Sequence, residues 1–412
     1  MRRHMWLSKD YLRKKGVYSI CSSNSYVIEA SIEFAKEKGD YILIEATPHQ
    51  VNQFGGYSGM TPEDFKNFVM KIAKEKGLEE DKIILGGDHL GPLPWQDEPS
   101  PTAMNKAKDL IRAFVESGYK KIHIDCSMPL SDDPKVLPYE KIAERTRELF
   151  EIAEETARKY NFQPVYVVGT DVPIAGGGEE EGVTSVEDFR SAISSLKKYF
   201  NDVPNIWDRV VGFVIMLGIG FSYDKVFEYD RDKVRGILEE VKREDLFVEG
   251  HSTDYQARYA LRNMVEDGVR ILKVGPALTA AFRRGVFLLS NIEDEIIPER
   301  ERSNIKRVIL ETMLRYDRYW RKYYKDSKRL ELDIWYNLLD RIRYYWEYED
   351  VKMVLNKLFE NFLEGVDIKF IYQYFYDSYF DVREGKMKND PRELIKKEIK
   401  RVLEDYSYAI NL

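Results

Sequence analysis

Residues 86–92 read GGDHLGP and place Asp88 beside His89 directly after the apolar residues 83–85. Aspartate and histidine are side chains that bind metals and transfer protons. The surrounding glycines allow a sharp turn or a close approach of backbone. The pair is therefore a candidate corner of an active site, with Asp88 as general acid/base. The alternative is that Asp88 orients a neighbour and His89 is a hydrogen-bonded structural histidine.

A second histidine, His251, follows another apolar run in a similar position. Two imidazoles and one carboxylate suit Zn²⁺, or alternatively Mn, Co, Ni or Mg, with a position left open for substrate. We therefore predict His89, His251 and Asp171 as ligands of a divalent metal ion. Asp171 could instead cap a turn before Pro173.

Three further segments offer polar groups to this predicted site. Ser252, Thr253 and the backbone around Gly275 follow the last two apolar runs, where barrel enzymes commonly bind phosphate. The run at residues 176–182, GGGEEEG, is either a solvated loop or a lid in which Glu179 or Glu180 transfers a proton. Together these groups indicate a phosphorylated small molecule with a metal-polarised carbonyl.

Eight short apolar or β-branched runs alternate with amphipathic segments rich in Lys and Glu. The runs begin at residues 17, 41, 83, 121, 165, 210, 246 and 268. This alternation predicts a (β/α)₈ barrel, with a doubly wound open sheet as the competing architecture. In a barrel the carboxyl ends of the strands share one mouth, so the polar residues above would converge there. Within the fourth run, His123 is expected to fill the barrel interior.

The strand pattern stops near residue 277. We predict a barrel core over residues 1–276 and a helical extension over residues 277–412 that packs on the barrel. The extension is rich in aromatic residues, which indicates either core packing of large helices or an interface or lid.

Composition restricts the class of protein. The chain has 412 residues, 43% of them hydrophobic, and a net charge of −7 from 64 basic and 71 acidic residues, which argues against nucleic acid as a partner. There is no apolar stretch of membrane-spanning length, and residues 1–16 do not resemble a signal peptide. Two cysteines cannot form a disulfide framework, so we expect a reducing cytoplasm. The Glu and Lys content is typical of thermophile proteins. The composition also leaves open a homo-oligomer.

Long motifs in one order resemble a known family. They are YSICSSNSYVIEA, IEATPHQVNQFGGYSGMTPEDF, LGGDHLGPLPW, KIHIDCSM, GTDVPIAGG, EGHSTDYQ, LKVGPALT, DRIRYYW and VREGKMKNDPRELI. In these segments the chain resembles the Z subunit family of class II D-tagatose-1,6-bisphosphate aldolase. The resemblance extends from about Val17 to the final helix and implies the same (β/α)₈ barrel.

The resemblance implies two alternative functions. Members are generally described as non-catalytic subunits that support a separate catalytic aldolase subunit in galactitol or N-acetylgalactosamine breakdown. Some relatives are described as epimerases that interconvert D-fructose 6-phosphate and D-tagatose 6-phosphate at C4. We favour the metal-dependent epimerase, acting by retro-aldol and aldol steps, because a structural subunit has no physical need for an Asp–His pair and a phosphate loop in register.

The layout of the class II aldolases assigns roles by similarity. It implies Asp88 as acid/base, His89 as metal ligand and Asp171 in place of a glutamate ligand. Another histidine ligand of those enzymes would fall on strand six, where this chain has Met-Leu-Gly at residues 216–218. The complete set of expected substrate or phosphate contacts is Gln53, Asp125, Ser127, Ser252, Thr253, Asp254, Lys273 and Gly275.

Overall fold

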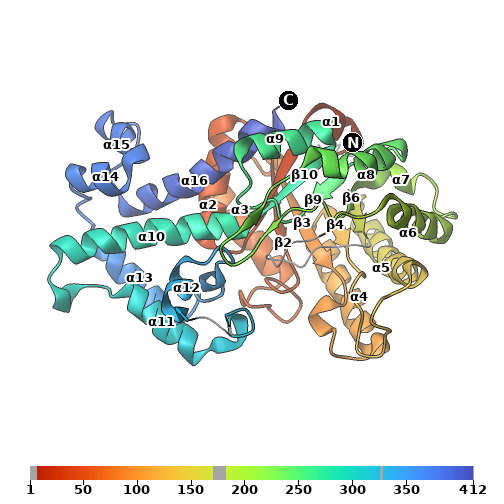
Figure 1. Cartoon of the computed structure of the whole chain (residues 1–412), viewed down its shortest axis with the longest axis horizontal. Helices are drawn as coiled ribbons and strands as arrows, with labels where there is room; N and C mark the ends of the chain where they lie inside the picture. The colour runs from red at the N-terminus through yellow and green to blue at the C-terminus, as the bar shows by residue number, and fades with distance from the viewer. Residues whose placement is uncertain (1–6, 170–181, 325–327, 412) are drawn as a thin grey trace.

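Eight parallel strands close into a barrel in a computed structural model that describes residues 7–169, 182–324 and 328–411 (Figure 1). Their order around the barrel is β1-β10-β9-β6-β5-β4-β3-β2. The strands are β1 (Val17–Cys21), β2 (Ile42–Ala46), β3 (Ile83–Leu90), β4 (Lys121–Ile124), β5 (Val165–Gly169), β6 (Val210–Val214), β9 (Val248–Gly250) and β10 (Val269–Val274). The predicted (β/α)₈ barrel is confirmed, and the doubly wound sheet is wrong. A two-stranded sheet of β7 (Gly220–Phe221) and β8 (Val226–Phe227) follows β6.

A helix follows each barrel strand, because each apolar run is succeeded by a segment of helical periodicity. These helices are α2 (Ser25–Lys38), α3 (Pro62–Lys76), α4 (Ser100–Glu116), α5 (Tyr139–Lys159), α6 (Val186–Tyr199), α8 (Arg231–Arg243), α9 (Arg258–Asp267) and α10 (Pro276–Ile296). Helix α3 begins with a reciprocal capping box between Thr61 and Asp64, and Pro62 occupies the first turn. Short helices are α1 (Lys9–Lys14), α7 (Ile206–Arg209), η1 (Glu80–Lys82) and η2 (Leu93–Trp95).

The barrel interior is layered. Alternate residues of a strand face the same side, so every second residue points inward. The lower layer is apolar and includes Val17, Leu43 and Ile271, packed against Leu7 and Leu12 from the N-terminal segment. The next inward positions on the same strands carry Ser19, Glu45 and Lys273. The interior therefore changes from apolar to charged toward the carboxyl ends of the strands.

The C-terminal extension lies mainly on the α10 side of the barrel (Figure 1). It contains η3 (Glu299–Glu301), α11 (Ile305–Arg315), η4 (Asp317–Tyr319), α12 (Leu330–Tyr336), η5 (Arg341–Tyr344), α13 (Glu349–Glu360), α14 (Ile368–Tyr374), α15 (Tyr376–Arg383) and α16 (Pro391–Ile410). Helix α16 returns to the barrel and packs on α2, α9 and α10. The domain boundary at residue 276 stays a prediction. Among the described residues, no helix combines the length and apolarity needed to cross a membrane.

Candidate functional site

Asp88 and His89 lie at the mouth end of β3, in an irregular part of the strand. The register between β3 and β4 shifts between Gly87 and Leu90, and His89 has a φ of 51°, in the left-handed region. A histidine held there costs conformational energy, which is typical of functional sites. The backbone N–H of His89 donates to Nδ1 of His123 at 3.1 Å. The irregularity allows two consecutive side chains, Asp88 and His89, to reach the same site.

The glycines of residues 86–92 are explained by close contacts. A Cβ on Gly86 would lie 2.4 Å from Oε1 of Glu45, and a Cβ on Gly91 would lie 1.8 Å from the carbonyl oxygen of Asp125. Only glycine leaves room for the buried carboxylate and the neighbouring backbone. The motif therefore accommodates the charged interior next to Asp88.

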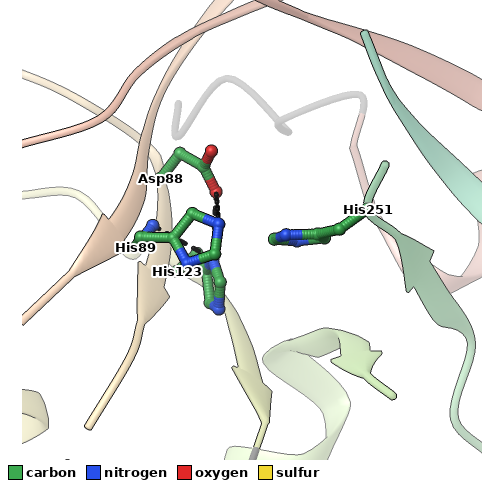
Figure 2. A group of neighbouring side chains, drawn as sticks. All are labelled: Asp88, His89, His123 and His251. Atoms are coloured by element: carbon green, nitrogen blue, oxygen red, sulfur yellow. Dashed lines mark hydrogen bonds and ion pairs between the residues drawn. The ribbon is translucent and has the colours of Figure 1, made fainter. Parts of the chain in front are cut away.

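Three imidazoles and one carboxylate gather at the barrel mouth. Asp88, His89, His123 and His251 each offer a ligand atom, and these atoms lie within 4.8 Å of one another. Figure 2 shows His251 reaching toward the other three side chains from the opposite side of the barrel. The ring centroids of His89 and His251 are 4.7 Å apart. Strand β4 thus contributes an imidazole, His123, to a site where the class II aldolase layout expects one from strand six.

Each of two imidazoles is held by a carboxylate through one ring nitrogen. Nδ1 of His89 lies 2.8 Å from Oδ2 of Asp125, and Nε2 of His251 lies 3.0 Å from Oε1 of Glu249. Such contacts leave the other ring nitrogen available and fix the orientation of the ring. Nε2 of His123 is buried without a hydrogen-bond partner among the described residues. This donor set fits a divalent transition metal ion.

Below the imidazoles lies a network of buried charges. Nζ of Lys121 lies 2.5 Å from Oε1 of Glu45 and 2.6 Å from Oε2 of Glu249. Nζ of Lys273 lies 2.7 Å from Oδ1 of Asp88 and also pairs with Glu45. The connected carboxylates are Glu45, Asp88, Asp125 and Glu249, against the two ammonium groups of Lys121 and Lys273. The four carboxylates outnumber the two ammonium groups, and this excess of negative charge favours a bound cation.

The surroundings of Asp88 and His251 shift the pKa values of both groups and so set their protonation states. Burial opposes ionisation of Asp88, but Lys273 and His89 overcome it and hold the pKa of Asp88 well below its ordinary value. Burial lowers the pKa of His251 to about 3, despite the hydrogen bond to Glu249. His251 is therefore neutral, which is the form that binds metals, and Asp88 is ionised, which is the form that accepts a proton.

A cavity of about 120 Å³, here called the mouth cavity, opens above the cluster. Asp88, His89, His251 and Lys273 line its floor. Its other walls include Arg343, Tyr344 and Trp346, which come from η5 and the residues that follow it in the extension. The extension therefore contributes side chains to the site.

Not all of the other predicted site residues line the mouth cavity. Asp125 holds His89, and both the hydroxyl and backbone N–H of Ser127 donate to Oδ1 of Asp125. Ser252 lines the mouth cavity. Thr253 Oγ1 donates to the carbonyl of Lys273 at 2.5 Å, and Thr253 does not line the mouth cavity.

Among the predicted site residues that the structure describes, Gln53 lies apart from the cluster. Gln53 donates from Nε2 to the carbonyl of Lys106 and does not line the mouth cavity. The predictions for Asp171, Glu179 and Glu180 lie outside the described residues.

Asp254 occupies the backbone donors at which we expected phosphate. Its Oδ1 accepts from the N–H of Gly275 at 3.0 Å and from the N–H of Ala277 at 2.8 Å. Both Asp254 and Gly275 line the mouth cavity. An anion at these N–H groups would have to displace or adjoin a carboxylate, so the predicted phosphate contact at Gly275 stays a prediction.

Asp254→Asn is expected to stabilise the protein at pH 8. Burial raises the pKa of Asp254 from 3.8 to about 6, so the folded state favours the protonated acid. Folding stability therefore falls as pH rises between these two values, by up to about 3 kcal/mol. Asparagine keeps the accepting Oδ1 without the ionisation. Thermal unfolding should show a higher midpoint for the variant at pH 8 and a smaller difference at pH 5; an unchanged or lower midpoint at pH 8 would contradict this account.

Several residues of the site escaped sequence reasoning. Glu45 and Lys121 stand inside apolar runs, at positions that alternation assigns to the interior, and this was an available signal. His123 was expected as interior filling, and it is fully buried but also belongs to the imidazole cluster. Arg343 and Tyr344 belong to the motif DRIRYYW, but nothing in the sequence placed that motif at the barrel mouth, because it lies far away in the chain.

The closed barrel with an Asp and His cluster at its mouth defines an aldolase-like TIM-barrel protein. More specifically, the chain belongs to the D-tagatose-1,6-bisphosphate aldolase subunit GatZ/KbaZ-like family, which it matches over residues 3–411. It is 36% identical to a solved protein from Sinorhizobium meliloti 1021 described as a probable tagatose 6 phosphate kinase, with a TM-score of 0.88, covering 96% of this chain and 100% of that one. Fructose-bisphosphate aldolase from Campylobacter jejuni shares the fold at 14% identity, with a TM-score of 0.53, covering 98% of this chain and 93% of that one.

Proposed function

We propose that the protein is a metal-dependent ketohexose-phosphate 4-epimerase that interconverts D-fructose 6-phosphate and D-tagatose 6-phosphate. The observation that carries the proposal is the convergence of Asp88, His89, His251 and Lys273 on one cavity, with His123 in the same cluster. Family membership supports a sugar-phosphate ligand. The relative from Sinorhizobium meliloti is described as a probable tagatose 6 phosphate kinase, and this description names one of the two proposed substrates.

Inversion at C4 proceeds by cleavage and re-formation of the C3–C4 bond. Asp88 takes the proton from the C4 hydroxyl as the bond breaks, and returns it after the aldehyde fragment has presented its other face. Lys273, 2.7 Å from Asp88, keeps that carboxylate ionised before the reaction. His89, His123 and His251 would hold a divalent metal, which supplies Lewis-acid polarisation of the substrate carbonyl when bound.

Both fragments must stay in place between the two steps, since recombination has to be faster than release. Tyr344 and Trp346 from the extension, together with Tyr57, line the mouth cavity above the reacting groups. Their rings would exclude water and retain the aldehyde.

An assay of the purified chain alone tests the proposal. With a divalent metal salt, it is expected to convert fructose 6-phosphate to tagatose 6-phosphate, as followed by NMR. A chelator should abolish conversion, and restored metal should recover it. Accumulation of free triose phosphate would indicate net aldol cleavage instead. Absence of conversion with each of Zn, Mn, Co, Ni and Mg would refute the epimerase.

A second candidate is a stabilising subunit of a class II aldolase, as the family description suggests. It is favoured by an exposed aromatic surface on α14 and α15, where Tyr372, Tyr376 and Phe380 are each more than half exposed. Large exposed apolar surfaces commonly mark protein interfaces. Under this alternative, Asp88→Asn leaves stabilisation of an aldolase partner unchanged.

A further inference from the structure

A second cavity of about 610 Å³ adjoins the mouth cavity. His49, Tyr57, His89 and Tyr344 line both cavities. The residues specific to the second cavity include three cations from the extension, Arg318, Lys322 and Arg341. The imidazole of His89 therefore lies between a reaction chamber on one side and a basic chamber on the other.

Arg341 is buried without a countercharge in the described part of the chain. It is only 3% exposed, and its guanidinium lies 3.4 Å from the ring centroid of Tyr323. Its single hydrogen bond among the described residues runs from Nη1 to the hydroxyl of Tyr344, at 3.3 Å. Nε and Nη2 are buried without partners there. Burying an unpaired guanidinium is costly, so an anion that reaches Nε and Nη2 would be stabilised by two unused donor nitrogens.

The guanidinium groups of two neighbouring arginines, Arg283 and Arg343, are paired more fully than that of Arg341. Arg283 pairs with Asp340 at 2.6 Å. Arg343 donates to the carbonyls of Leu339 and Asp340 and to the hydroxyl of Tyr344. Arg341 alone among these three combines deep burial with unpartnered guanidinium nitrogens in the described residues.

The other cations stand at the rim. Arg318 and Lys322 are exposed, and in residues 7–169, 182–324 and 328–411 neither has a carboxylate partner. Both line the second cavity with Arg341. A guanidinium fork with two further cations is well suited to a phosphate dianion.

We propose that the second cavity is a phosphate subsite, in which Arg341, with Arg318 and Lys322, binds the phosphomonoester end of the substrate. That the ligand is a sugar phosphate rests on the proposed function. The three cations of the subsite come from the C-terminal extension, and the other walls of the second cavity, including Asp125, come from the barrel. The backbone donors of Gly275 and Ala277 stay bound to Asp254. The ketose chain would extend past His89, so that its reacting carbons lie in the mouth cavity.

Binding of inorganic phosphate tests the subsite without any turnover. Calorimetry or ³¹P NMR titration should show saturable binding to the full-length, metal-loaded protein. The rim variant Arg318→Ala/Lys322→Ala should weaken it roughly tenfold or more, because two charge-assisted contacts are lost. Arg341→Met should abolish it, with thermal unfolding to check folding.

The matched control is Arg315→Ala/Arg321→Ala, which removes the same charge from the same segment. These arginines pair with Asp350 and Asp317 and line neither the mouth cavity nor the second cavity. Binding should be unchanged in this control. No binding to the parent protein, or equal weakening in the rim and control variants, would overturn the subsite. Phosphate held by the metal would be insensitive to the rim variant and would also count against it.

Kinetics then separates the subsite from the proposed function. In the rim variant, KM for the sugar phosphate should rise, and the ratio of kcat/KM for tagatose 6-phosphate over free tagatose should fall at least tenfold. Phosphate binding that depends on Arg341 in a protein without epimerase activity would uphold the subsite and refute the epimerase. Epimerase activity with an unchanged ratio in the rim variant would refute the subsite alone.

Discussion

Asp88→Asn is expected to reduce 4-epimerase turnover by roughly 10²- to 10⁴-fold, the range for removal of a positioned general base. Asparagine has nearly the same shape but cannot accept the C4 hydroxyl proton. The loss should appear in kcat, because the remaining lining of the mouth cavity is kept.

Two measurements make this result specific. The metal content per chain should be determined in parallel, because Asp88 also belongs to the candidate ligand cluster. Asp109→Asn is a matched control: Asp109 is an exposed acid on α4, the helix that follows β3, and pairs there with Arg112. Turnover near the parent level in Asp88→Asn would exclude Asp88 as the base.

Lys121→Met is expected to cause the largest loss of stability, about 3 to 5 kcal/mol. The Lys121 side chain is fully buried and bridges Glu45 and Glu249, which are also fully buried. Removing the ammonium leaves two carboxylates with reduced compensation in the barrel interior, although Lys273 still contacts both. The measurement is the shift of the urea unfolding midpoint at pH 7.

Lys108→Met provides the comparison on the surface of α4. Lys108 pairs with Glu148, and both side chains are partly exposed, so its loss should cost no more than about 1 kcal/mol. Adding Glu45→Gln to Lys121→Met should recover part of the lost stability, since one uncompensated charge is removed. Equal midpoints for Lys121→Met and Lys108→Met would show that the buried network contributes little.

The barrel could be predicted because its signal is local. Each apolar run alternates with a helical segment, and all eight runs became barrel strands. The carboxyl ends of barrel strands share one mouth, and from this we predicted that Asp88, His89, His251 and Lys273 lie together. The cluster and the ion pairs show that they do. Gln53 and Thr253 were expected at the same site but do not line the mouth cavity. Residues in the loops beyond a strand can turn away from the mouth.

Sequence by itself determined that eight strands alternate with helices, which favours a barrel, and which strand ends carry reactive side chains, since periodicity and chain order suffice for both. The closure of the strands into a barrel was decided by the tertiary structure. Only the tertiary structure decided what surrounds the reactive side chains. The carboxylate of Asp254 accepts a hydrogen bond from the backbone of Gly275. Arg341 and Tyr344 of η5 line a cavity beside His89, although they lie about 250 residues away from it in the chain. Such contacts depend on how helices pack on the outside of the barrel, and helical periodicity specifies which face is buried but not which distant segment covers it.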